Sequence, residues 1–463
     1  MSVSKPSASQ PDLETLAAEL VELALKAGAT DAEAAVSEGD EFSVNVRQGA
    51  VETLKEAGSR AAGIRVFLGQ RTGSASSSDL TADGIRQLVE GAIALARVTE
   101  PDPNAGLADA AEYGQAAGDL HLYSDDVYSL PGDERIQMAL RAEAAALAAD
   151  TRITNSEGGS FDAATGRKAL ANSRGFVGSY RSSSASISAS ALAAEPNGNL
   201  QRDGWWSSAR RLSDLATPES VGAEAARRAV RRLGAQRVAT QQVPIVFAPE
   251  VARSIAGLIF DAASGDAIWR GASFLAGKVG QSIATSKLTL IDDNLMILPN
   301  GMGGFGTSPF DGEGMPSRRT VVVEQGRLLT YLNNTYSARK LGARSTGNAA
   351  RGLAGAPGIG CGNLYIEPGS DSPEAIIAGV NSGLYVTSLM GFGVNLVTGD
   401  YSRGATGLWI EKGQLTHAVE EITIAGNLTE MLMNLTAIGN DLEFRSAVAA
   451  PTLRIDGMTI AGS

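Results

Sequence analysis

The side chains that could carry chemistry in this chain are few and widely separated. Its 463 residues include only two histidines, His121 and His417, and one cysteine, Cys361. A zinc site needs about four nitrogen, sulfur or oxygen ligands, with its histidines and cysteines at short spacing, and neither histidine has such a neighbour. We therefore interpret both histidines as surface or strand residues and Cys361 as a buried structural thiol. A Cys-His dyad would require Cys361 to meet a histidine in space.

Carboxylates form the second group of candidates. Paired carboxylates can hydrolyse bonds or bind a hard metal ion. In this sequence they are scattered through predicted turns, where solvation and capping explain them more simply than catalysis does. The residues concerned are Asp292, Asp293, Asp311, Glu313, Asp400, Glu420, Glu421 and Asp441.

Glycine-rich segments carry little information, because the chain contains 54 glycines. The segment GMGGFG at 301–306 lacks the strand-to-helix setting of a dinucleotide-binding loop, so we predict a plain loop there. The segment MGFGVNLVTGDYSRGATGLWIEKG at 390–413 places Asp400, Tyr401 and Arg403 in a predicted turn between strands. That turn is either a binding edge or an ordinary β-turn stabilised by an Asp–Arg pair, and the sequence leaves both open.

The charge balance limits the class of partner. The formal net charge is −12, whereas binding to nucleic acid needs a basic surface. The one basic cluster, Arg227-Arg228 with Arg231-Arg232, lies late in a predicted helix, and we interpret it as a solvated face that complements the helix dipole. No apolar run approaches the roughly 20 residues that cross a bilayer, and the first residues lack a secretory signal. A single cysteine suits a reducing compartment, so we expect a cytoplasmic protein without membrane or nucleic-acid partners.

The elements that must position these groups divide the chain into two domains. Residues 1–235 are expected to form an α+β domain, with helices laid on an antiparallel sheet. Its strands are predicted as many short alternating segments that end at glycines or polar turns, in a meander. Apolar residues at helical spacing predict its helices, the first of them capped by Asp12. The predicted helices cover residues 12–27, 81–97, 133–149 and 219–233.

Residues 236–463 are expected to form a β-rich domain with a curled or barrel-like antiparallel sheet. It opens with an apolar helix between Val251 and Phe260, followed by many short β segments. The segments VEQGRLL and IEKGQLT each place a glycine-containing turn between apolar residues, which predicts two hairpins. Short helical interruptions are predicted at 333–341, 373–382 and 427–435.

Several segments of the C-terminal half resemble the TldD/PmbA family, also called modulators of DNA gyrase. They are NNTYSARKLGARSTGNA, MGFGVNLVTGDYSRGATGLWIEKG, EITIAGNLTEM and IGNDLEFRSA, and RGASFLAGKVGQ resembles the PmbA (TldE) branch in particular. The resemblance implies a cytosolic two-domain protein of a metalloprotease family. In the TldD branch, a helix carries H-E-x-x-x-H, in which two histidines bind zinc and the glutamate is the general base. A cysteine near the C-terminus supplies a further ligand there.

Anchoring the resemblance on GDAIWRGASFLAGKVGQ places that motif on residues 256–261 of this chain. The first ligand position is Ala256, the base position is Gly257 and the second ligand position is Asp261. Ala256 has no donor atom, Gly257 cannot accept a proton, and one aspartate alone does not hold zinc. No cysteine follows IGNDLE either. The resemblance therefore implies no zinc site of the family type and no cofactor in this chain, with zinc expected in a TldD-type partner.

Three functions stay open. The favoured one is a non-catalytic PmbA/TldE-type subunit, which pairs with a TldD-type chain and completes a chamber for unfolded peptides around the partner's zinc. Strand edges in such a chamber can bind peptide by β-addition. Weak candidates for its wall are Arg270, Asp400, Tyr401 and Arg403. The alternatives are a self-sufficient hydrolase that uses Asp261 with an unidentified metal, and a homodimeric peptide-binding or scaffold protein without proteolysis. The favoured function also leaves room for a homodimer in the partner's absence.

Overall fold

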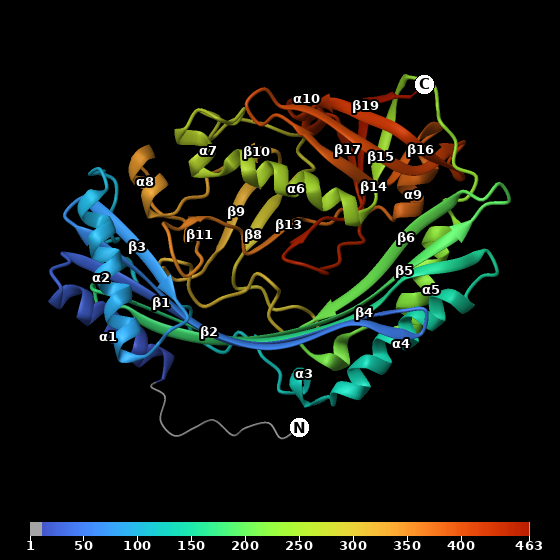
Figure 1. Cartoon of the computed structure of the whole chain (residues 1–463). Coiled ribbons are helices and arrows are strands. Elements are labelled where there is room, and N and C mark those ends of the chain that lie inside the picture. The colour runs from blue at the N-terminus through green and yellow to red at the C-terminus, as the bar shows by residue number, and fades with distance from the viewer. Residues whose placement is uncertain (1–11, 463) are drawn as a thin grey trace.

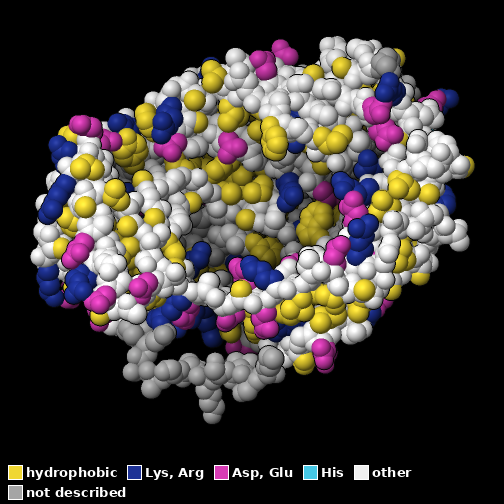
Figure 2. All heavy atoms as spheres, viewed as in Figure 1, with side chains coloured by type: hydrophobic (Ala, Val, Ile, Leu, Met, Phe, Trp, Pro, Cys, Tyr) yellow, Lys and Arg dark blue, Asp and Glu magenta, His cyan; other side chains and the backbone are white. Residues whose placement is uncertain are grey.

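A long curved sheet and a β-rich C-terminal domain face each other across a hollow (Figures 1 and 2). The computed structural model describes residues 12–462. The α+β prediction is confirmed: helices lie on one antiparallel sheet in the N-terminal half, and the C-terminal part holds a closed barrel. None of the described helices is long and apolar enough to cross a membrane.

The N-terminal sheet has six strands in the order β3-β2-β1-β4-β5-β6, and all neighbours are antiparallel. Its strands are β1 (Asp31–Arg47), β2 (Ala50–Leu68), β3 (Arg71–Ser77), β4 (Ile153–Asn172), β5 (Val177–Ala194) and β6 (Leu200–Ala209). The prediction of many short segments is wrong here, because β1 and β2 run unbroken through Gly39 and Gly58. A Cβ on Gly39 would lie 2.6 Å from the carbonyl oxygen of Thr165, so this glycine allows close strand approach and makes no turn.

Helices cover the convex face of this sheet at its two ends. At one end, α1 (Leu13–Lys26) and α2 (Ala82–Val98) pack on a core that includes Val36 and Ile64. At the other end, α4 (Gly132–Ala148) and α5 (Pro218–Val230) pack on a core that includes Phe42 and Phe161, beside the short α3 (Asp126–Ser129). The four predicted helices are confirmed to within a few residues.

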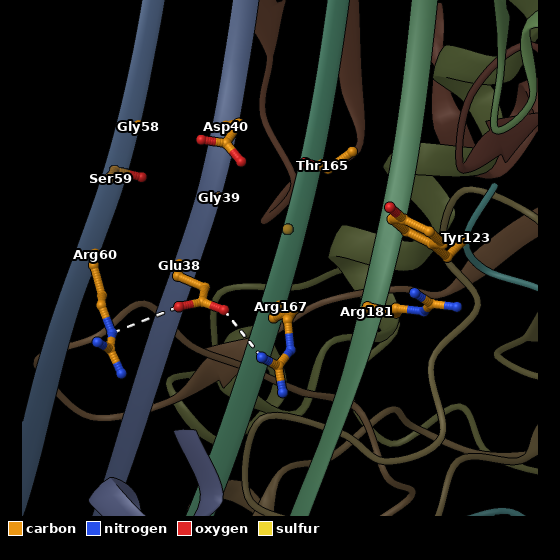
Figure 3. A pocket seen from close by; sticks show the side chains of 11 residues that line it. Glu38, Gly39, Asp40, Gly58, Ser59, Arg60, Tyr123, Thr165, Arg167 and Arg181 are labelled. Atoms are coloured by element: carbon orange, nitrogen blue, oxygen red, sulfur yellow. Dashed lines mark hydrogen bonds and ion pairs between the residues drawn. The ribbon is translucent and has the colours of Figure 1, made fainter. Parts of the chain in front are cut away.

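The predicted cap of the first helix is wrong. The side chain of Asp12 makes no capping hydrogen bond; its Oδ1 accepts a hydrogen bond from Arg167 Nη2 at 2.8 Å. Arg167 and the Arg60 side chain both lie within ion-pair distance of Glu38, on the stretch of convex face between the two helix pairs (Figure 3). Arg181 continues this row and stacks on Tyr123 at 4.0 Å. The row borders an open cavity of about 490 Å³.

The C-terminal domain contains a closed five-stranded barrel, which confirms the barrel-like prediction. The strand order is β16-β15-β14-β7-β19, and pairing of β16 with β19 closes it. All pairs are antiparallel except β7 with β14. The barrel strands are β7 (Gln241–Phe247), β14 (Ser382–Val394), β15 (Asp400–Glu411), β16 (Gln414–Asn427) and β19 (Leu453–Ala461), and β17 (Leu435–Ile438) adds to β19.

A second sheet lies beside the barrel, in the order β10-β9-β8-β13-β18. These strands are β8 (Leu290–Asp293), β9 (Arg319–Glu324), β10 (Arg327–Leu328), β13 (Asn363–Ile366) and β18 (Val448–Ala449), with a separate pair β11 (Ala349–Ala350) and β12 (Gly358–Ile359). Both predicted hairpins are confirmed, as β9–β10 and β15–β16. The helices are α6 (Pro249–Ala263), α7 (Gly265–Trp269), α8 (Thr335–Leu341), α9 (Pro373–Ala378) and α10 (Leu428–Met433), and the three short helical interruptions are confirmed.

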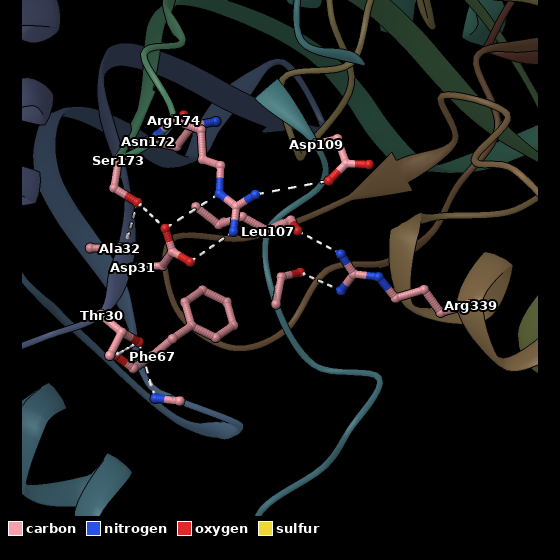
Figure 4. A network of polar contacts seen from close by, with 12 residues as sticks. Thr30, Asp31, Ala32, Phe67, Leu107, Asp109, Asn172, Ser173, Arg174 and Arg339 are labelled. Atoms are coloured by element: carbon pink, nitrogen blue, oxygen red, sulfur yellow. Dashed lines mark hydrogen bonds and ion pairs between the residues drawn. The ribbon is translucent and has the colours of Figure 1, made fainter. Parts of the chain in front are cut away.

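Direct contacts fix the N-terminal part of the chain and the C-terminal domain to each other. Arg339 of α8 donates hydrogen bonds to the carbonyls of Asn104 and Gly106, both at 3.1 Å, in the segment that follows α2. It also donates to the carbonyl of Leu107 at 2.6 Å (Figure 4). The loop between β11 and β12 rests directly on the backbone of the sheet, because the carbonyl oxygen of Leu353 would lie 1.6 Å from a Cβ on Gly63 of β2. These contacts hold the N-terminal part of the chain against the C-terminal domain.

Candidate functional site

Helix α6 lies above the hollow and carries the positions matched to the zinc motif (Figure 1). Pro249 in its first turn pre-sets the backbone, and buried residues recur at Val251, Ile255 and Ile259. Ala256 belongs to this buried face and is 0% exposed. A side chain at position 256 therefore points into the core of the domain.

The opposite face of α6 is open. It presents Arg253, Gly257 and Asp261 at four-residue spacing, with Ser254 and Leu258 beside them. Nothing lies within 4 Å of where a Cβ on Gly257 would stand. Asp261 is exposed, and the partial burial of its carboxyl raises its pKa above the usual range.

These residues do not fit a zinc ion. One carboxylate on the open face is the only metal-binding group at the three motif positions, and Ala256 faces away from it. Within residues 12–462, no group of three His, Cys, Asp or Glu side chains is arranged to hold a metal. The histidines are as predicted: His121 is exposed in a loop, and His417 lies on β16 with its ring stacked on Trp409.

Cys361 lies in the wall of the hollow and is half-buried, against the apolar core of the C-terminal domain. Burial, with the nearby charges of Asp292 and Asp261, raises the pKa of its thiol to about 12. The thiol is therefore protonated at neutral pH and is a poor nucleophile. This supports the structural interpretation of Cys361, although the residue is less buried than we expected.

The hollow contains a cavity of about 740 Å³ between the concave face of the sheet and the C-terminal domain. A neighbouring cavity of about 410 Å³ shares Ala164, Ser184 and Phe305 with it, so the two adjoin. Their floor is rich in hydroxyl groups, because serine stands at every second position of this part of β5. Ser182, Ser184 and Ser186 line the two cavities. The row continues along β5 with Ser188 and Ser190, and all five serines are partly exposed.

Three carboxylates that we expected to be solvated, Asp292, Asp311 and Glu313, are buried in the C-terminal domain, and Asp311 lines the larger cavity. Asp311 accepts hydrogen bonds from the backbone N–H groups of Glu313, Met315 and Ala349, at 2.9 to 3.0 Å. Burial raises its pKa to about 7 and that of Asp292 to about 6, and it also raises the pKa of Glu313. The solvation prediction is wrong for these three because each serves loop backbone or side-chain donors inside the fold.

The basic cluster of α5 is also less solvated than predicted. Arg228 is 5% exposed, pairs with Asp203 at 3.3 Å and with Glu250, and stacks on Trp205 at 4.6 Å. Glu250 lies in the first turn of α6. Arg228 therefore links α5 to the helix above the hollow, whereas Arg227 stays exposed.

The segment at 390–413 forms strands where the sequence predicts a turn at Asp400. The turn comes earlier, at 396–398, and Asp400 begins β15. Asp400 accepts hydrogen bonds from Thr398 Oγ1 at 2.6 Å and Asn427 Nδ2 at 3.4 Å, and the guanidinium of Arg403 points instead to the carbonyl of Met390, so the predicted Asp–Arg pair is wrong.

Tyr401 is 1% exposed, and burial raises the pKa of its phenol to about 12. Its ring is therefore packed inside the barrel, whereas the neighbouring candidates Asp400 and Arg403 are exposed and half-buried, respectively. Arg270 is exposed and stacks over Trp269 at 4.3 Å. The segment that follows Arg270 contacts the turn between β14 and β15, because the N–H of Phe274 donates to the carbonyl of Leu396 at 2.7 Å.

Comparison with known protein families gives three consecutive matches. Residues 32–96 match domain 1 of the PmbA/TldA metallopeptidases, residues 125–233 match their central domain, and residues 240–462 match their C-terminal domain. The matches cover both walls of the hollow and all of α6.

Individual proteins agree with these matches. Metalloprotease PmbA of Escherichia coli O157:H7 is 41% identical over 461 residues, which cover 99% of this chain and 98% of that protein. A crystal structure of a candidate modulator of DNA gyrase from Bacteroides thetaiotaomicron superposes with a TM-score of 0.89 at 29% identity, over 97% of this chain and 99% of the other. TldE from Thermococcus kodakarensis superposes with a TM-score of 0.84 over 96% and 100% of the two chains; at 22% identity, this likeness shows the fold alone.

Proposed function

Because the chain belongs to the PmbA/TldD metallopeptidase family, we propose that it is a non-catalytic, TldE-type subunit that works with a zinc-bearing TldD-type chain. The observation that carries this proposal is the open face of α6. At the three positions matched to the zinc motif, Ala256 points into the core, Gly257 has no side chain and Asp261 is a lone carboxylate. A helix with this face can pack and line a wall, but it lacks the ligands and the base for zinc hydrolysis.

The hollow would then be this subunit's half of a peptide chamber. Its floor offers the small serine side chains of β5, which can donate and accept hydrogen bonds without selecting large side chains. Such a surface suits an unfolded peptide read through its backbone. Arg270, Asp400 and Arg403 lie on exposed or half-exposed surface and are proposed contacts to peptide or partner. We place the complex in the cytoplasm, since a chain with one cysteine suits a reducing compartment.

The test is co-expression of this chain with a TldD-type chain, followed by purification through a tag on this chain alone. We expect a complex that contains zinc and hydrolyses an unstructured peptide, while this chain alone does neither. Mutation of the partner's zinc-binding histidines should abolish turnover, and Asp261→Ala in this chain should not.

Two results would replace this proposal. Stoichiometric zinc and peptide turnover by the isolated chain, both lost in Asp261→Ala, would establish a self-sufficient hydrolase. A stable homodimer that ignores the TldD-type chain in size measurements and binds peptide without hydrolysis would establish a scaffold protein.

A further inference from the structure

Trp205 and Trp206 lie next to each other on β6, the strand at one edge of the N-terminal sheet. Both indoles are half-buried, and their ring centroids are 5.4 Å apart. Arg445 of the C-terminal domain stacks on Trp205 at 4.1 Å, and Arg253 of α6 lies over Trp206 at 5.9 Å. Aromatic side chains that stay partly exposed in the wall of a cavity indicate a surface that a ligand can cover.

Two small cavities border these indoles. Their volumes are about 240 and 170 Å³, and Trp205, Trp206, Glu443 and Arg445 line both of them. The smaller cavity reaches the N-terminal end of α6, where Arg253 lines it. It is smaller than the pockets of roughly 300–1,000 Å³ that hold whole small ligands. Its size therefore suits one side chain of a larger ligand.

The smaller cavity lies next to the serine floor of the hollow. Arg445 and Ser446 line it, and both also line the 410 Å³ cavity together with Ser184 and Ser186. A peptide extended along these serines therefore passes Arg445. Successive side chains of an extended chain point to opposite sides, so one side chain can enter the smaller cavity while its neighbours face the serines.

The carboxylates in the wall of the smaller cavity already have partners. Glu443 pairs with Arg445, and Glu250 pairs with an arginine of α5. Asp441 accepts two hydrogen bonds, at 2.9 and 2.7 Å, from the backbone and the hydroxyl of one threonine. A basic side chain would compete with these pairs. An acidic side chain gains little either, because the three carboxylates line the cavity with two arginines, Arg253 and Arg445.

We propose that this cavity is a subsite for an aromatic side chain of an extended peptide, with Trp206 and Arg445 in its wall. An uncharged ring packs favourably against an indole, and the planar guanidinium of an arginine stacks on a ring face. The inference rests on the proposed function for the peptide itself. It adds that the chamber prefers peptides with an aromatic residue, a preference that the serine floor alone does not provide.

Calorimetric titration of the full-length chain tests this subsite. The probes are hexapeptides of glycine and alanine with both ends blocked, which differ only at one central residue: phenylalanine, leucine, alanine or glutamate. We expect the phenylalanine peptide to bind about tenfold more tightly than the alanine peptide, the order expected for burial of one ring. The leucine peptide should bind a few fold more weakly than the phenylalanine peptide, and the glutamate peptide should resemble the alanine peptide.

Variants locate the effect. Trp206→Leu keeps an apolar side chain without the ring, and it should remove most of the preference for phenylalanine. Arg445→Met should reduce the preference by a few fold, and it leaves only the exposed carboxylate of Glu443 without its partner. Arg86→Met, on the exposed part of α2, is the matched control for Arg445→Met and should leave the preference unchanged. If Trp206→Leu fails to fold, the Arg445 variant and the four peptides still decide.

Four outcomes would overturn the proposal: equal binding of the phenylalanine and alanine peptides, equal binding of the phenylalanine and leucine peptides, a preference that survives in both variants, or no binding of any peptide at millimolar concentration. None of them decides whether this chain supports a zinc-bearing partner, because that is measured by hydrolysis in the co-purified complex.

Discussion

The two faces of α6 differ in what their side chains do. The buried face packs Val251, Ile255 and Ile259 into the core of the C-terminal domain, as a helix in a working enzyme would. The open face presents Gly257 and Asp261 to solvent and has few groups that could do chemistry. Packing and catalysis are thus separate demands on one helix, and they fall on different faces of it. A matching fold therefore cannot establish activity, which depends on the residues of the site.

The largest effect should come from the buried face. Ile255→Ala removes a side chain that is 1% exposed, and we expect it to lower the free energy of unfolding by about 2–5 kcal/mol. Leu258→Ala, on the half-exposed side, is the matched control and should cost clearly less. Urea unfolding followed by tryptophan fluorescence measures both. Equal losses would mean that the two faces are not distinct in packing.

A histidine on the buried face is the next test. Ala256→His forces an imidazole into a site with no exposed surface, and overpacking of this kind costs about 1–3 kcal/mol before any unpaired polar atom is counted. Asp261→His places the same residue on the open face and should be tolerated. If Ala256→His were as stable as the native chain, the packing of α6 around this position would be looser than described.

A stabilising change is expected at Gly257. Glycine inside a helix costs up to about 1 kcal/mol relative to alanine, and a Cβ here meets nothing within 4 Å. Gly257→Ala should therefore raise the unfolding midpoint in urea. Gly265→Ala serves as the contrast. Its Cβ would stand 2.0 Å from Oδ1 of Asn333, so this substitution should destabilise the chain. A loss of stability in Gly257→Ala would mean that the open face is filled.

The smallest effect should come from Asp261. Partial burial raises its folded-state pKa above the unfolded value, so its ionisation slightly destabilises the folded state once the pH exceeds the unfolded pKa. Asp261→Asn should raise the free energy of unfolding by no more than about 0.5 kcal/mol at pH 7. It should have no effect near pH 3, where the carboxyl is protonated in both the folded and the unfolded state. Urea unfolding at the two pH values measures this, and a loss at pH 7 would show that the carboxylate has a stabilising partner.

Much of the fold follows from local patterns. Periodic apolar residues and turn glycines predict the helices and the two hairpins, and they also predict the barrel-like sheet. The length of β1 and β2 does not follow, because Gly39 and Gly58 look like turn residues until the neighbouring strand is known. Gly39, for example, pairs with Gly166 of β4, more than 100 residues away, and no local sequence pattern records such a contact.

The site is harder to predict than the fold. The apolar spacing of α6 and the residue types at 256, 257 and 261 can be read directly, but the burial of Tyr401, Asp311 and Arg228 depends on tertiary packing. The segment SSSASISAS does place a serine at every second position of β5, but the sequence alone does not show that this row faces a hollow.

The contact of Leu353 with Gly63 has a consequence for how this gene can vary. Any amino acid other than glycine at position 63 adds a Cβ that would stand 1.6 Å from a main-chain oxygen, and no rotamer can relieve a clash with an atom that is part of the backbone. Position 63 therefore accepts no residue other than glycine unless the loop at 351–355 changes at the same time. Position 257, with open space around it, can be altered without such a compensating change.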